Sequence, residues 1–112
     1  MGNLGYELLK YAAAEKIDGM LFFSSDSIYG RTQSIEAIAE SDIGLFDFSE
    51  IGNFYGESKR SGEALCKAYS IEYGVPAKSI RIHHTYGPSM DIKNDKRVFA
   101  DFVQKVVDVN YL

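Results

Sequence analysis

Helix-type and strand-type segments alternate along this chain, and this alternation restricts its fold more than any other feature. Apolar residues recur at helical spacing in three stretches, and two short apolar runs of strand length lie between them. The predicted helices span residues 4–16, 53–73 and 97–107, and the predicted strands span residues 19–24 and 78–83. Because strands separated by helices pair in parallel through right-handed crossovers, the sequence predicts an α/β fold with a parallel sheet.

Local signals indicate where these elements begin, end and face the core. Asn3 is the expected N-cap of the first helix, and Gly19 and Gly74 are the expected stops of the first two helices. The apolar faces are predicted at Leu4, Leu8, Tyr11 and Ala12 in the first helix, at Leu65, Ala68 and Tyr69 in the second, and at Phe99, Phe102, Val103, Val106 and Val107 in the third. Residues 30–52 show no period and are predicted to form a long functional loop, and residues 109–112 resemble the start of another strand.

Charge and composition exclude several classes of protein. A net charge of -4 gives no electrostatic reason for a nucleic-acid partner. The longest apolar run, residues 20–23, is too short to cross a bilayer, and the N-terminus has no signal-peptide pattern. The single cysteine, Cys66, is expected to be a buried apolar residue of a protein from the reducing cytoplasm.

Tyr55 and Lys59 lie four residues apart at the start of the second predicted helix. Side chains at this spacing share one helix face, and a neighbouring ammonium favours the phenolate form of a tyrosine. Such a tyrosine can act as a general acid or base. By itself this pattern also fits a surface tyrosine and a solvated lysine.

Hydroxyl and carboxyl groups follow the first predicted strand, where open α/β sheets bind ligands. Ser25 offers a hydroxyl and Asp26 a carboxyl group at this point. The same residues could instead only cap the local backbone.

Taken in order, these motifs resemble the extended short-chain dehydrogenase/reductase family, in particular its nucleotide-sugar epimerases, dehydratases and decarboxylases. The resemblance rests on Ser24-Ser25, on the Tyr55/Lys59 helix continuing as Lys59-Arg60-Ser61-Gly62-Glu63, and on the loop Tyr86-Gly87-Pro88. It covers nearly the whole chain. It implies a segment of a Rossmann-type doubly wound parallel sheet, with residues 1–112 forming one partial domain that lacks the N-terminal dinucleotide-binding half and the C-terminal substrate domain.

The resemblance also implies a role for each matching residue. Ser25 would bind the 4-oxygen of a nucleoside-diphosphate sugar, and Tyr55 would remove the proton of the 4-hydroxyl while hydride passes to NAD or NADP. Lys59 would bind the nicotinamide ribose and favour the tyrosinate, with Ser24 on the cofactor side. Asp26 matches the general acid of a dehydratase.

On the substrate side, His84 stands where the family usually has an asparagine that contacts the diphosphate, and Tyr86 lies two residues further along. Both are candidate substrate-binding residues, but neither His83 nor His84 is expected to take part in the chemistry. No metal site is expected.

The reaction subtype stays open at this point. Asp26 matches the dehydratases, but Ser27 replaces their companion glutamate, and the spacing from Tyr86 to Arg97 is most similar to the decarboxylases. The expected function is a nucleotide-sugar 4,6-dehydratase or epimerase, for cell-surface polysaccharide synthesis. A decarboxylase of the same family and a non-catalytic α/β remnant are the alternatives.

The phosphate-binding turn of dinucleotide folds is missing from the sequence. No G-x-x-G-x-x-G motif occurs, so this chain alone is expected to bind NAD weakly or not at all. It is also expected to form a homodimer or larger assembly through the helices at 4–16 and 53–73, the pair through which members of the family dimerise.

Overall fold

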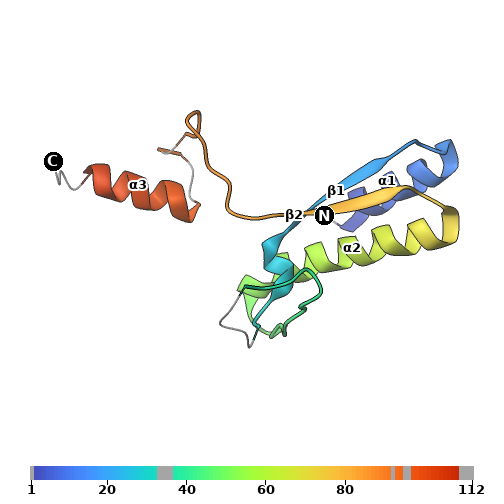
Figure 1. The fold of residues 1–112 in the computed structure, drawn as a ribbon, viewed down its shortest axis with the longest axis horizontal. Helices are drawn as coiled ribbons and strands as arrows, with labels where there is room; N and C mark the ends of the chain where they lie inside the picture. The colour runs from blue at the N-terminus through green and yellow to red at the C-terminus, as the bar shows by residue number, and fades with distance from the viewer. Residues whose placement is uncertain (1, 33–36, 92, 95–96, 109–112) are drawn as a thin grey trace.

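The alternation of helices and strands predicted from the sequence is present in the fold. A computed structural model describes residues 2–32, 37–91, 93–94 and 97–108. The elements follow in the order α1 (Gly2–Glu15), β1 (Met20–Ser25), η1 (Asp26–Tyr29), η2 (Ile51–Asn53), α2 (Phe54–Tyr73), β2 (Ala77–Ile82) and α3 (Val98–Asp108), where η denotes a short 3-10 helix (Figure 1). The predicted strand at residues 109–112 lies outside the described residues.

The ends of the first helix differ from the prediction. α1 begins at Gly2, so Asn3 lies inside its first turn and is not the cap. It ends at Glu15 because Lys16 takes a left-handed conformation with φ of 49°, three residues before Gly19. The end of α2 is as predicted, since Gly74 has φ of 67° and its N–H bonds the Tyr69 carbonyl.

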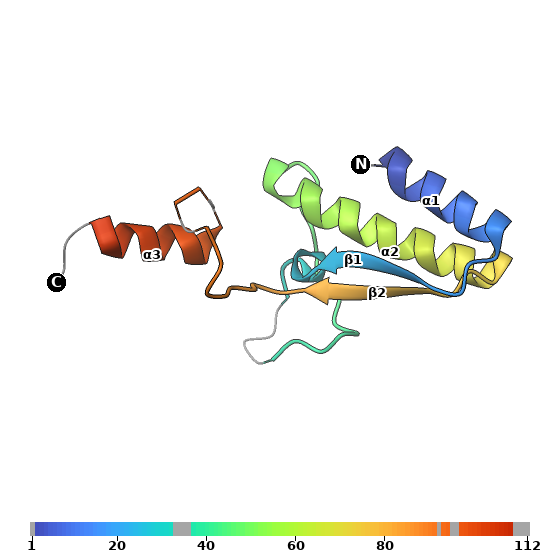
Figure 2. The ribbon, with the colours of Figure 1, turned by 90° about the horizontal axis from the view of Figure 1, so that it is seen from above.

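β1 and β2 pair in parallel, in a register that runs from Met20 opposite Ala77 to Ser25 opposite Ile82. Both helices α1 and α2 lie on one face of this two-stranded sheet (Figure 2). The approach of α2 to β1 depends on Gly62, because a Cβ there would come within 2.3 Å of the Phe22 ring. Because the strands are parallel and paired in this register, both end at the same edge of the sheet, beside the first turn of α2.

The buried core lies between the two helices and the sheet, and its members differ in part from the prediction. It contains Leu9, Ala12, Cys66 and Val75, with Tyr69 packed against it. Leu4, Leu8, Tyr11, Leu65 and Ala68 were predicted to face the core, but they are exposed. The reason is that each helix covers the sheet with only part of its apolar surface. Cys66 is buried as expected, and this burial raises the pKa of its thiol.

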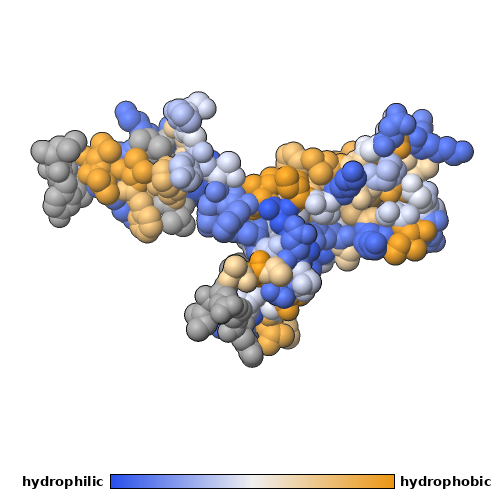
Figure 3. All heavy atoms as spheres, viewed as in Figure 1, coloured by the Kyte–Doolittle hydropathy of each residue, from blue (hydrophilic) through white to orange (hydrophobic). Residues whose placement is uncertain are grey.

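The sheet face opposite the helices is apolar and uncovered by the described residues. Leu21 is 55% and Phe23 58% exposed, and Ile80 and Ile82 also face outward. Figure 3 shows hydrophobic surface both on this part of the molecule and on α3.

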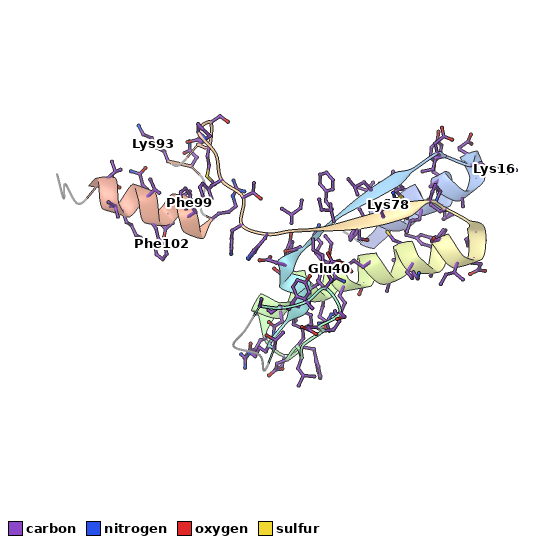
Figure 4. The ribbon with its side chains drawn as sticks, viewed as in Figure 1. Lys16, Glu40, Lys78, Lys93, Phe99 and Phe102 are labelled. Atoms are coloured by element: carbon purple, nitrogen blue, oxygen red, sulfur yellow. The ribbon has the colours of Figure 1, made fainter. Side chains whose placement is uncertain are left out.

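α3 stands apart from the α/β unit at the end of an extended segment that follows β2 (Figure 1). The predicted helix is present, and its apolar side chains include Phe99 and Phe102, which project from it (Figure 4). The ring of Tyr86 stacks on Phe99 with centroids 4.2 Å apart and so joins the segment to the helix. None of the described helices is both long enough and apolar enough to span a membrane.

We expect the chain to self-associate in solution, because exposed apolar side chains on α1 and on the open sheet face gain by burial. Size-exclusion chromatography with light scattering should report a dimer or larger species. Leu8→Lys should weaken association if the helices form the contact, whereas Leu21→Lys should weaken it if the open sheet face does. A monomer at high concentration would contradict this expectation.

Candidate active site

The parallel strands place their carboxyl ends at the mouth of one cavity of about 520 Å³. Its lining comes from the end of β1, from η1, from the first turns of α2 and from the segment after β2. Every residue expected for the site from the sequence lines this cavity: Ser24, Ser25, Asp26, Tyr55, Lys59, His84 and Tyr86. The structure therefore brings together residues as far apart in the sequence as Ser24 and Tyr86.

Ser25 is fixed by the turn that it begins. It caps η1, and its Oγ accepts a hydrogen bond from the backbone N–H of Ser27 at 3.1 Å. The same hydroxyl lies 3.1 Å from Asp26 Oδ1 and 3.1 Å from Ser27 Oγ, either of which can accept its proton. Only 7% of Ser25 is exposed, so its hydroxyl has a defined position at the cavity wall.

Tyr55 and Lys59 share a face of α2, as their spacing predicts. Lys59 Nζ lies 5.6 Å from the centre of the Tyr55 ring and donates a hydrogen bond to the Phe23 carbonyl at 2.7 Å. This bond holds the ammonium at the end of β1 and leaves its other N–H groups for a ligand. Tyr55 is 51% exposed and lines the cavity, so a bound molecule can reach its side chain.

The contact between Asp26 and His83 was not anticipated from the sequence. The Asp26 carboxylate meets His83 Nδ1, and the rings of His83 and His84 lie 5.1 Å apart. The two histidines directly follow β2, just as Asp26 directly follows β1. Parallel pairing predicts that the residues after the two strand ends lie near one edge, but the contact itself depends on the register that places Ser25 opposite Ile82.

An arginine-centred cluster supports the site from the helix-covered side of the sheet. Arg81 of β2 binds both carboxylate oxygens of Glu63 on α2, at 2.8 and 3.0 Å. It also donates to the Tyr29 hydroxyl at 3.2 Å and to the Glu40 carbonyl at 2.7 Å. Arg81 thereby ties α2, η1 and the long loop to the second strand.

Arg60 makes a second tie to the same loop. Its guanidinium donates to the Ile28 carbonyl at 2.7 Å and to the Gly44 carbonyl at 3.1 Å, and it lies 4.1 Å from the centre of the Phe46 ring. Because Ile28 belongs to the turn that begins at Ser25, Arg60 links that turn to the helix of Tyr55 and Lys59. The sequence motif contains this arginine, but its role follows only from the fold.

Removal of the Glu63 charge should change how stability depends on pH. Hydrogen bonds from Arg81, opposed in part by burial, hold the pKa of Glu63 below its ordinary value of 4.5. The stabilisation is therefore complete above that value and is lost as the pH falls through the lower pKa of the folded protein. Urea unfolding should show that Glu63→Gln loses less stability than the wild type between neutral pH and about pH 3.

A matched control for this prediction is Glu50→Gln. Glu50 pairs with Arg31 on the surface, where both side chains are about half or more exposed, so its removal should have little effect at any pH. Equal acid sensitivity of wild type and Glu63→Gln would show that the Arg81 pair does not stabilise the fold.

Comparison with known proteins gives the site its context. A family model described as the NAD dependent epimerase/dehydratase family matches residues 2–110. UDP-glucuronic acid decarboxylase 5 of Arabidopsis thaliana is 32% identical over 88 residues, which are 79% of this chain and 25% of that protein. UDP-glucuronic acid decarboxylase 1 of Xenopus tropicalis is 43% identical over 49 residues, which are 44% of this chain and 11% of that protein.

A solved structure is similar in fold. A UDP-glucuronic acid 4-epimerase from Bacillus cereus, in complex with NAD, superposes with a TM-score of 0.73 and 24% identity over 93% of this chain and 31% of that one. This likeness confirms the prediction that the chain is a segment of a Rossmann-type α/β fold. The chain spans a quarter or less of the two decarboxylases and less than a third of the epimerase.

Proposed function

The chain belongs to the NAD dependent epimerase/dehydratase family, and we propose that it carries the acid–base residues of an enzyme that oxidises the C4 hydroxyl of a nucleoside-diphosphate sugar. The observation that carries this proposal is the common cavity of Ser25, Tyr55 and Lys59 at the carboxyl ends of the strands.

Tyr55 is the proposed base. Its side chain is open to the cavity, where its hydroxyl can exchange a proton with the sugar hydroxyl, and the Lys59 ammonium lies 5.6 Å from the centre of its ring. Ser25 lines the same cavity, where its hydroxyl can bind the same sugar oxygen. Tyr55 then holds the proton until it is returned to the sugar.

The residues present fit the nicotinamide ribose end of NAD. The N–H groups of Lys59 that do not bond the Phe23 carbonyl can bind ribose hydroxyls, and Ser24 lines the same cavity. When bound, NAD or NADP supplies the oxidation by accepting the hydrogen of C4 with its electron pair. The sequence contains no G-x-x-G-x-x-G turn for the pyrophosphate, so residues 1–112 account for only one end of the cofactor.

The three similar proteins described above favour a uronic-acid substrate. The names of the two decarboxylases and of the solved epimerase all specify UDP-glucuronic acid. We therefore propose a nucleoside-diphosphate hexuronic acid as the substrate and decarboxylation or 4-epimerisation as the reaction. A 4,6-dehydratase is the second candidate, because loss of a 6-hydroxyl needs an acid and Asp26 offers a carboxyl group beside Ser25 in the cavity.

Product analysis tests these alternatives directly. The chain, alone and within the longest polypeptide that carries it, is incubated with NAD and with UDP-glucuronic acid, UDP-glucose or dTDP-glucose. Mass spectrometry should show loss of carbon dioxide for a decarboxylase, unchanged mass with a new 4-epimer for an epimerase, and loss of water for a dehydratase. If the longer polypeptide binds NAD but converts none of the sugars, the proposal is wrong.

A further inference from the structure

A second set of ligands lies within the cavity beside Ser25 and Tyr55. It consists of Asp26, His83 and His84, whose donor atoms all lie within 4.8 Å of one another. His83 Nδ1 already contacts the Asp26 carboxylate. No other group of three such side chains in the described part of the chain comes as close together.

The fold explains why these three side chains meet. Asp26 is the first residue after β1 and His83 is the first after β2, and the last residues of the two strands, Ser25 and Ile82, are paired in register. Hydrogen bonds support both sides of the cluster: the Ser25 hydroxyl lies 3.1 Å from Asp26 Oδ1, and Thr85 Oγ1 donates to the His83 carbonyl at 3.0 Å. The Ser25 hydroxyl is a partner of the kind that orients a carboxylate ligand of a metal ion, whereas the Thr85 bond holds the backbone of His83.

The donor set indicates the class of ion. Two imidazole nitrogens and one carboxylate suit Zn²⁺ and similar transition-metal ions, whereas Mg²⁺ and Ca²⁺ prefer oxygen ligands throughout. With Zn²⁺ bonds of about 2.0–2.2 Å, donor atoms on one ion lie roughly 3.3 Å apart. The His83 side chain is 75% exposed, so a rotation can bring its donor atom to that separation.

We propose that Asp26, His83 and His84 form a three-ligand site for Zn²⁺ or a similar divalent transition-metal ion. The remaining coordination positions would face the cavity, as in zinc sites that keep one position open. An ion bound there would take the Asp26 carboxylate as a ligand. The inference depends on the geometry of the three side chains and not on the activity proposed above.

The composition of the chain makes this site easy to test. These are its two histidines, and its one cysteine, Cys66, is buried in the core between helix and sheet. Calorimetric titration with ZnCl₂ should show one ion per chain. Replacement of His84 by Ala should weaken binding by at least about 10–100-fold, since even loss of an outer partner has an effect of that size.

Asp26→Asn should weaken binding in the same way, whereas the matched control Asp18→Asn should not, because Asp18 lies in the exposed turn between α1 and β1. The histidines are exposed, so circular dichroism should show that the variants keep their fold. Absence of saturable Zn²⁺ binding would overturn the proposal. It would also be overturned if the double variant His83→Ala/His84→Ala bound Zn²⁺ as tightly as the wild type.

Discussion

Tyr55→Phe is expected to lower turnover by roughly 10²–10⁴-fold in an active enzyme that carries this chain, the range for loss of one acid–base group. The substitution removes only the hydroxyl that exchanges a proton. Tyr55 is half exposed and is absent from the buried core, so its ring contacts and the fold should be unchanged. The loss should therefore fall on kcat, with little change in the affinity for the nucleotide sugar.

Tyr11→Phe is the matched control, because it removes the hydroxyl of another exposed helix tyrosine that lies outside the cavity. Its turnover should equal that of the wild type. If Tyr55→Phe kept half of the activity, Tyr55 would be a surface residue of α2 and the proposed base would be wrong.

Asp26→Asn is expected to separate a dehydratase from the other two reactions. In a dehydratase the sugar should still be oxidised at C4, but loss of water should fall by roughly 10²–10⁴-fold, since hydroxide leaves slowly without a proton. The 4-keto sugar and reduced cofactor would then accumulate. In an epimerase or a decarboxylase no hydroxide leaves C6, so this variant should keep most of its turnover.

Both outcomes can be read from the ratio of 4-keto sugar to final product by mass spectrometry. Asp42→Asn, a change of an exposed acid in the long loop outside the cavity, serves as the control. Unimpaired loss of water in the Asp26→Asn variant would show that Asp26 is not the acid, and the dehydratase candidate would lose its support.

Much of the fold could be predicted because local signals and topology agreed. The apolar runs gave each strand to within one residue, and Gly74 marked the end of α2 correctly. The end of α1 could not be read in this way, because Lys16 adopts a conformation that glycine usually supplies. The core was harder still, since periodicity locates an apolar stripe but not the part of it that another element covers. Leu9 and Cys66 are buried, while Leu8 and Leu65, one residue away in each case, are exposed.

The candidate site shows the same division. The residues that the family motifs contain, such as Ser25, Tyr55 and Lys59, could be placed together from the sequence, because the ends of parallel strands meet at one edge. The contacts of Arg60 and Arg81 with the long loop could not, since the loop has no period that would predict where its carbonyl groups lie. The pair of Asp26 and His83 also depends on the register of the two strands, which only the fold supplies.

Transfer of the C4 hydrogen is the most direct test of the central proposal that Ser25, Tyr55 and Lys59 serve oxidation at that carbon. UDP-glucuronic acid with deuterium at C4 is incubated with NAD and an active polypeptide that carries the chain, and the reduced cofactor is recovered after quenching for mass spectrometry. We predict that the reduced cofactor recovered from the wild type carries the deuterium. With Tyr55→Phe, almost no reduced cofactor should form. Conversion of the sugar with a reduced cofactor that carries only ordinary hydrogen would contradict the proposal.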